Sequence, residues 1–198
     1  MIYTGVMVPY DPALSRVSYD PTPLICANQT CGEHVHQPLV VPGEQIGRPG
    51  RTYRVIRCLN CLFDAPYFTF FDGDLPIRIE FEPIDGECHH FIEQRKDDSM
   101  PNVVSLEWRP GPPDPSEDWS HNVAGGEPNW EQEPVEIDCP GCGKPMEFIL
   151  QFASSAIDPY FRARDLQKTI YLKIEYYATL YLFACESCNI TASQTQCS

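Results

Sequence analysis

The stretch CPGCGKPMEFILQF, residues 139–152, places two cysteines two residues apart in a turn and continues as a run typical of a β-strand. Pro140 and Gly141 allow the tight turn in which two sulfurs can each lie about 2.3 Å from one zinc ion. Such a pair could instead perform redox chemistry or close a disulfide. A thioredoxin-like redox pair, however, begins a helix in a βαβ pattern, whereas KPMEFILQF reads as a strand. The stretch therefore favours a metal knuckle in a β-rich fold.

Most of the other cysteines also occur in closely spaced pairs. Together with Cys139 and Cys142, these pairs give two sets of four: Cys26, Cys31, Cys58 and Cys61 form the first set, and Cys139, Cys142, Cys185 and Cys188 form the second. The 26 residues between the pairs of the first set, and the 42 in the second, can form hairpins that return the second pair beside the first. This spacing is typical of zinc ribbons. We predict two structural zinc ions, because four thiolates saturate zinc and leave no position for a reacting water.

The N-terminal sequence MIYTGVMVPYDP has no basic segment followed by an apolar run, so it does not resemble a signal peptide. The apolar stretch TIYLKIEYYATLYLFAC alternates and carries Lys173 and Glu175, which fits strands better than a membrane helix. We therefore expect a cytoplasmic protein without a membrane segment. In that reducing compartment, paired cysteines bind metal more often than they form disulfides.

The chain is strongly acidic, with 28 acidic and 14 basic residues and a formal net charge of -14. Each zinc bound by four thiolates would add a further formal charge of about -2, since the thiols count as neutral in that sum. A phosphate backbone would be repelled by this surface, which argues against nucleic-acid binding despite the finger-like cysteines. The composition instead predicts a basic protein partner.

Period-two alternation is frequent along the chain and predicts a mostly β fold. PIRIEFE would place Ile77, Ile79 and Phe81 on one face of a strand, and TIYLKIE has the same pattern in residues 169–175. Further strand-like runs are YRVIRC, YFTFF, VVSLEW, MEFILQF and TLYLFAC. Helical periodicity is confined to a turn or two in residues 158–167.

The sequence divides into an N-terminal β module (1–109), an acidic proline-rich connection (110–138) and a C-terminal β module (139–198). The two modules are expected to be zinc-ribbon-like, and their loosely similar order of elements suggests a pseudo-duplication packed as one unit. The connection holds six prolines and eight acidic residues but no lysine or arginine. Its indoles could anchor the connection on a sheet or bind a partner. The candidate partner-binding residues are Trp119, Trp130, Glu131, Glu133 and Glu136.

The motifs GGEPNW, CPGCGKPMEFILQF and LYLFACESC occur in an order that resembles the programmed cell death protein 2 and YwqG-like zinc-ribbon family. The resemblance covers residues 125–188, and the first half of the chain lacks the family's strand motifs. It implies a β-rich protein-binding scaffold, with the second cysteine set as metal ligands. Its turn would be Gly125, Gly126, Pro128 and Trp130, and its strand glutamine Gln151. In the eukaryotic branch it implies shielding of a basic ribosomal protein, and relatives of the bacterial branch are found among proposed immunity proteins.

The best candidate for a catalytic cluster is ECHH, which contains Cys88, His89 and His90. A cysteine beside a histidine could act as nucleophile and base, or bind a further metal. Adjacent residues of a strand point to opposite faces, however, so Cys88 and His89 would not meet there. The sequence has no phosphate-binding glycine loop, nucleophile elbow or His-Glu-x-x-His helix. We therefore expect a non-enzymatic protein, with a Cys/His-dependent hydrolase or transferase as an alternative.

These observations give a leading hypothesis of a zinc-stabilised protein that neutralises a basic partner, as a bacterial immunity protein neutralises a cationic toxin. The alternative within the binding class is a dedicated chaperone for a basic ribosomal or other nucleic-acid-binding protein. Cys88, His89, His90 and Cys197 have no assigned role in either hypothesis.

Overall fold

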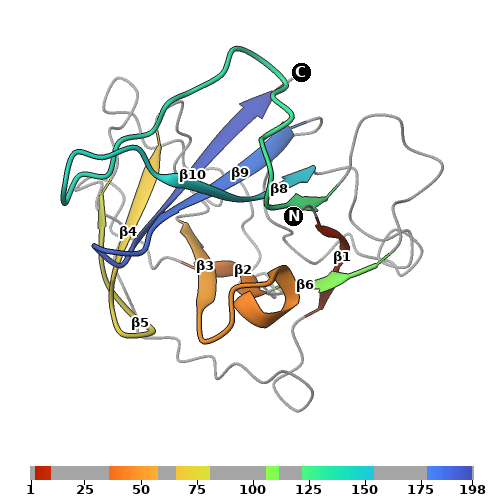
Figure 1. Cartoon of the computed structure of the whole chain (residues 1–198), viewed down its shortest axis with the longest axis horizontal. Helices are drawn as coiled ribbons and strands as arrows, with labels where there is room; N and C mark the ends of the chain where they lie inside the picture. The colour runs from red at the N-terminus through yellow and green to blue at the C-terminus, as the bar shows by residue number, and fades with distance from the viewer. Residues whose placement is uncertain are drawn as a thin grey trace, which may run out of the picture.

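A computed structural model describes residues 3–9, 36–57, 66–80, 106–111, 122–153 and 178–197 (Figure 1). These ranges contain ten β-strands, one short 3-10 helix and no α-helix. The predicted mostly β fold is therefore confirmed. Within the same ranges, no helix has the length and apolar character required to cross a membrane.

The elements follow one another along the chain in a simple order. They are β1 (Tyr3–Pro9), β2 (His36–Pro42), η1 (Gly43–Ile46), β3 (Thr52–Arg57), β4 (Tyr67–Asp72), β5 (Leu75–Glu80), β6 (Leu106–Pro110), β7 (Val123–Ala124), β8 (Glu147–Ala153), β9 (Ala178–Cys185) and β10 (Ile190–Cys197). The predicted runs fall in the observed strands: YRVIR lies in β3, YFTFF in β4, EFILQF in β8 and TLYLFAC in β9. The predictions for TIYLKIE and for helical turns in residues 158–167 lie outside the described residues.

The strands join in the order β3-β2-β6-β1-β7-β8-β9-β10-β4-β5. This order passes from one sheet to another at β1, where residues 3–4 pair with β7 and residues 5–9 pair with β6. Described neighbours pair antiparallel except β2 and β6, which are parallel. β4 and β5 come from the predicted N-terminal module but extend the sheet of β8, β9 and β10. Both predicted modules thus contribute strands to the same sheet.

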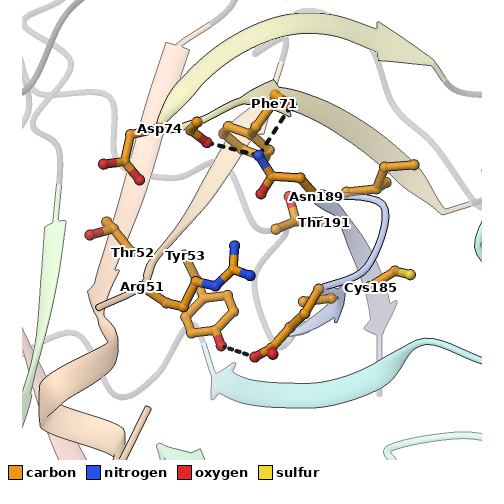
Figure 2. Close-up of a pocket in the computed structure, with 12 residues that line it drawn as sticks. Arg51, Thr52, Tyr53, Phe71, Asp74, Cys185, Asn189 and Thr191 are labelled. Carbon is orange, nitrogen blue, oxygen red and sulfur yellow. Dashed lines mark hydrogen bonds between the residues drawn. The ribbon is translucent and has the colours of Figure 1, made fainter. Parts of the chain in front are cut away.

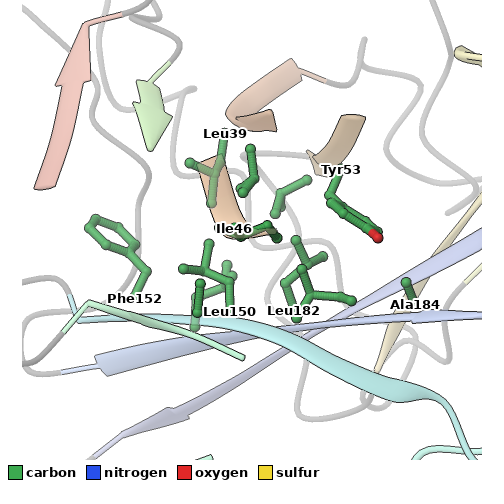
Figure 3. Close-up of a cluster of buried hydrophobic side chains, with 12 residues drawn as sticks. Leu39, Ile46, Tyr53, Leu150, Phe152, Leu182 and Ala184 are labelled. Atoms are coloured by element: carbon green, nitrogen blue, oxygen red, sulfur yellow. The ribbon is translucent and has the colours of Figure 1, made fainter. Parts of the chain in front are cut away.

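The first hydrophobic core lies between β7, β8 and β9 on one side and β2, η1 and β3 on the other (Figure 3). β9 contributes Leu180, Leu182 and Ala184 to this core. The facing elements contribute Leu39, Val41, Ile46, Tyr53 and Val55, all of them buried. Burial of this apolar surface holds the two sheets together.

The opposite face of the β8–β10 sheet carries a second core. β9 supplies Tyr181, Phe183 and Cys185 to this face, while Ile137 and Cys139 come from the segment that covers it. Because β9 is buried on both faces, its sequence TLYLFAC is an almost continuous apolar run. The second core extends directly into the cysteine cluster described below.

The predicted common face of Ile77 and Ile79 is wrong. Ile79 is 6% exposed, whereas Ile77 is 54% exposed. The pairing of β4 with β5 steps from Phe70 opposite Arg78 to Phe71 opposite Pro76, which leaves Ile77 as an extra residue. Such a β-bulge interrupts the alternation of side chains, so both Ile77 and Arg78 face outward.

Candidate metal centre

The first knuckle is a tight turn closed by backbone hydrogen bonds. The Cys139 N–H donates to the Lys144 carbonyl at 2.8 Å, and the Met146 N–H donates to the Ile137 carbonyl at 2.8 Å. Inside this frame the Gly143 N–H donates to the Cys139 carbonyl at 2.8 Å. Gly143 has a φ of 67°, a left-handed conformation that glycine adopts without a steric cost. The CPGCG sequence therefore folds as the predicted turn.

The second knuckle is the connection between β9 and β10, in which Cys185 pairs with Ile190. Asn189 ends the turn with a φ of 53°, and asparagine is among the few residues with a side chain that adopt this conformation readily. Its side-chain amide donates to the carbonyls of Phe71 at 3.1 Å and Gly73 at 2.8 Å (Figure 2). These bonds attach the second knuckle to the β4–β5 hairpin.

The two knuckles bring four free thiols together. Their Sγ atoms all lie within 4.8 Å of one another, and the Sγ atoms of Cys142 and Cys185 are 3.8 Å apart. Four sulfurs at about 2.3 Å from a tetrahedral zinc ion would be separated by about 3.8 Å. The predicted second set is therefore assembled at a spacing that could hold a metal ion; its members are Cys139, Cys142, Cys185 and Cys188.

The four thiols differ in their surroundings. Cys139 is 1% exposed and Cys185 is 9% exposed, whereas Cys142 is exposed and Cys188 half-buried. Burial raises the pKa of Cys139 to about 12. Burial would also raise the pKa of Cys185, but hydrogen bonds from the Ser187 hydroxyl, the Cys188 backbone N–H and neighbouring thiols lower it to about 6. Since a metal binds thiolates, filling the site would release protons.

Gly141 lies where the two knuckles approach each other closely. A Cβ atom at this position would lie 3.1 Å from Cys188 Sγ and 3.1 Å from the Ile190 Cδ1 atom. The Gly141 N–H also points to Cys139 Sγ, at an N···S distance of 3.4 Å. Gly141 therefore leaves room for Cys188, and its N–H would stabilise a negative charge on the sulfur of Cys139.

Trp130 lies against the same sheet as the cysteine cluster. Its ring stacks on Tyr181, with centroids 4.6 Å apart, and on Phe183 at 6.0 Å. The Tyr181 hydroxyl donates to the Asn129 carbonyl and accepts from the Glu131 N–H, both at 2.9 Å. These contacts are the ones expected of an indole that anchors the connection on a sheet.

The three candidate glutamates occupy different environments. The Glu131 carboxylate accepts a hydrogen bond from the Thr179 hydroxyl at 2.9 Å. Glu133 and Glu136 are exposed, although the Glu133 carbonyl accepts a hydrogen bond from the Gln196 side-chain amide at 2.9 Å. Glu133 and Glu136 are thus the members of this trio whose carboxylates a partner could reach most directly.

The glycine turn and the strand glutamine both hold the Trp130 segment. Gly125 and Gly126 have φ values of 73° and 74°, which turn the chain sharply after β7. The Gln151 side-chain carbonyl accepts a hydrogen bond from the Asn129 N–H at 2.6 Å. This is the local geometry of the residues on which the family resemblance rests.

Sequence reasoning missed a group of polar residues that joins the knuckles to the rest of the fold. Arg48 contacts both Glu147 and Glu186, and Tyr53 donates to Glu186. Asn189 was also missed, although its position at the end of the knuckle, where a left-handed residue is common, could have identified it. No local signal marks Arg48, because its partners are distant in the sequence.

Several predicted residues lie outside the described ranges. They are the first cysteine set (Cys26, Cys31, Cys58 and Cys61), Trp119, Cys88, His89 and His90. Cys197 ends β10 and is described by its backbone. The predictions about all of these residues remain predictions.

Comparisons with known proteins do not assign the chain to a family. A scan against protein-family models gave no match, and searches of curated proteins and of solved structures gave none either.

Proposed function

We propose that the chain is a non-enzymatic, zinc-stabilised protein that binds and neutralises a basic protein partner, as an immunity protein does for a cationic toxin. The observation that carries the proposal is the concentration of exposed acidic side chains on residues 122–153, the segment that also carries the first knuckle of the four-cysteine cluster. The resemblance stated above points in the same direction.

Zinc is the metal best suited to the cluster. Four thiolates in a tetrahedral arrangement favour zinc or an iron–sulfur centre, and the spacing of two short knuckles is that of zinc ribbons. Zinc bound in this way has no open coordination position, so its role is structural. By the same reasoning, the first cysteine set would hold a second zinc ion.

The acidic surface lies on the segment that carries the first knuckle. Residues 122–153 contain six acidic side chains and one lysine. The exposed acidic residues in this segment are Glu127, Glu133, Glu136, Asp138 and Glu147, of which Glu147 is already paired with Arg48. A concentration of one charge attracts a partner of the opposite charge and raises the association rate. This charge supports a basic protein and opposes nucleic acid as the partner.

The test is capture of partners by the tagged protein from a lysate of its own host, with washes at moderate and high salt. We expect a near-stoichiometric basic protein that remains at moderate salt and is lost at high salt. Its identity separates the two binding hypotheses. A toxin encoded beside this gene supports immunity, whereas a ribosomal protein made by every cell supports the chaperone alternative. Recovery of no basic protein at either salt would contradict the proposal.

Charge variants then test the surface itself with the identified partner. Replacing Glu131, Glu133 and Glu136 together with glutamine should slow association and reduce its salt dependence. The double variant Glu133→Gln/Glu136→Gln leaves the Thr179 contact intact and should retain most of this effect. A matched control is Glu44→Gln/Asp74→Asn, which removes two exposed charges elsewhere. Equal association rates for the two double variants would exclude the connection from the interface.

A further inference from the structure

Backbone hydrogen bonds fix the position of Arg48 independently of its side-chain contacts. It follows η1 and the residue that caps this helix, Gly47, which has a φ of 74°. The Arg48 N–H donates to the Gly43 carbonyl at 2.7 Å, and the Gly43 N–H donates to the Arg51 carbonyl at 2.8 Å. These two bonds close the loop between η1 and β3, so the guanidinium projects from a defined position.

The guanidinium of Arg48 binds two carboxylates at once. Both of its terminal nitrogens contact Glu147, with Nη1 at 2.9 Å from one carboxylate oxygen, which makes a bidentate pair. Nη1 also lies 3.2 Å from an oxygen of Glu186. The same Glu186 oxygen accepts a hydrogen bond from the Tyr53 hydroxyl at 3.0 Å. Arg48 thereby joins three separate segments of the chain.

The two carboxylates belong to the two knuckles. Glu147 begins β8, immediately after the turn that carries Cys139 and Cys142. Glu186 lies within the second knuckle, between Cys185 and Cys188. The Arg48 guanidinium therefore contacts one residue that follows the first knuckle and one residue within the second.

Removing this cation would change the charge balance of the site. Glu147 and Glu186 each lie within 3.2 Å of the same Arg48 nitrogen, so without it the two carboxylates would repel each other. A zinc ion bound by four thiolates would add a formal charge of about -2 nearby. The contact with Arg48 also holds the pKa of Glu147 below its ordinary value, so the pair is ionised at neutral pH.

We propose that Arg48 is a positioning residue for the metal centre, which holds the second knuckle against the first and slows the release of the bound metal. The proposal rests on the metal-binding part of the proposed function and is independent of the protein partner. Hydrogen-bonding residues around metal ligands typically change metal affinity by about 10–100-fold when they are removed. Arg48 acts through the knuckle backbone and not on a sulfur, so we expect an increase in the release rate of about 3–10-fold, at or below the low end of that range.

The test measures the rate of zinc transfer from the full chain to a coloured chelator, with a reductant present. The phase that belongs to this centre is the one that disappears in Cys142→Ser. Arg48→Met should accelerate this phase, and Arg48→Lys should give an intermediate rate, because lysine keeps the charge but loses the bidentate geometry. Arg51→Met is the matched control, since Arg51 is exposed and makes no ion pair with the described residues. Its release rate should equal that of the wild type.

A second control separates positioning from general stability. Val55→Ala removes a buried core side chain of β3 that is 1% exposed, and it should lower the urea midpoint without touching either knuckle. We expect Val55→Ala to release zinc at the wild-type rate under native conditions. If zinc release followed the urea midpoint in every variant, or if Arg48→Met and Arg48→Lys both released zinc at the wild-type rate, the inference would be overturned. A wild-type protein without bound metal would instead contradict the proposed function.

Discussion

The Sγ atoms of Cys142 and Cys185 lie 3.8 Å apart although 42 residues separate them in the sequence. Register between β8 and β9 produces this proximity, because Glu147 pairs with Ala184 and so places the two knuckles at the same end of the sheet. The cysteine cluster is therefore a direct product of strand pairing.

Gly141→Ala is expected to weaken metal binding at this centre. The added Cβ would approach Cys188 Sγ to 3.1 Å and Cys188 Cβ to 3.2 Å, so Cys188 would have to shift by a few tenths of an ångström. Competition with a chelator of known affinity measures the effect. Lys144→Ala, an exposed change in the same turn, is the control and should bind metal like the wild type. Unchanged affinity in Gly141→Ala would mean that the knuckles are further apart than described.

Asn189 combines a left-handed backbone with two hydrogen bonds, and two substitutions separate these contributions. Asn189→Gly keeps the backbone conformation but loses the bonds to Phe71 and Gly73, at a cost of about 1–2 kcal/mol of unfolding free energy. Asn189→Ala should cost about 1 kcal/mol more, because alanine is strained at a φ of 53°. Urea unfolding provides both values. Equal stability of the two variants would show that the backbone strain is absent.

Tyr181→Phe should loosen the Trp130 segment. The substitution removes the hydroxyl that donates to Asn129 and leaves the Glu131 N–H without its acceptor, which should cost about 1–3 kcal/mol of unfolding free energy. The ring remains, so the stacking with Trp130 should persist. Urea unfolding checks the loss of stability. A variant as stable as the wild type would argue against the described docking of this segment.

Burial raises the pKa of both Tyr53 and Tyr181 to about 12, from an ordinary value of 10. The folded protein therefore binds more protons than the unfolded chain between these pH values. The resulting stability is fully present below pH 10 and is lost as the pH rises from 10 to 12. Titration of tyrosinate absorbance should show a late-ionising group that disappears in Tyr53→Phe and another that disappears in Tyr181→Phe. Loss of neither group would contradict the described burial.

The strands and the second cysteine set could be predicted because both depend on local pattern. Runs such as TLYLFAC are long and apolar enough to form a strand in many contexts, and a Cys-x2-Cys pair has few geometries that serve one metal. The expectation that the two pairs converge then follows from assigning them to one metal ion. Neither inference needs knowledge of the topology.

The bulges and the long-range polar contacts could not be predicted in this way. Ile77 is exposed because β5 carries one residue more than β4, and Ile149 is similarly the extra residue of β8. Alternation in a single strand contains no information about the partner strand. Arg48 and Glu147 are 99 residues apart, so their ion pair is determined entirely by how the sheets pack.

The zinc content of the purified protein tests the assignment of the metal centre most directly. We would measure zinc per chain by elemental analysis in the wild type, in Cys142→Ser and in Cys88→Ser, all prepared with a reductant. We expect two zinc ions in the wild type and in Cys88→Ser, because Cys88 belongs to neither set. We expect one zinc ion in Cys142→Ser, with a lower thermal stability, since metal binding and folding are coupled. A Cys142→Ser protein with the same zinc content as the wild type would contradict the assignment of the metal centre.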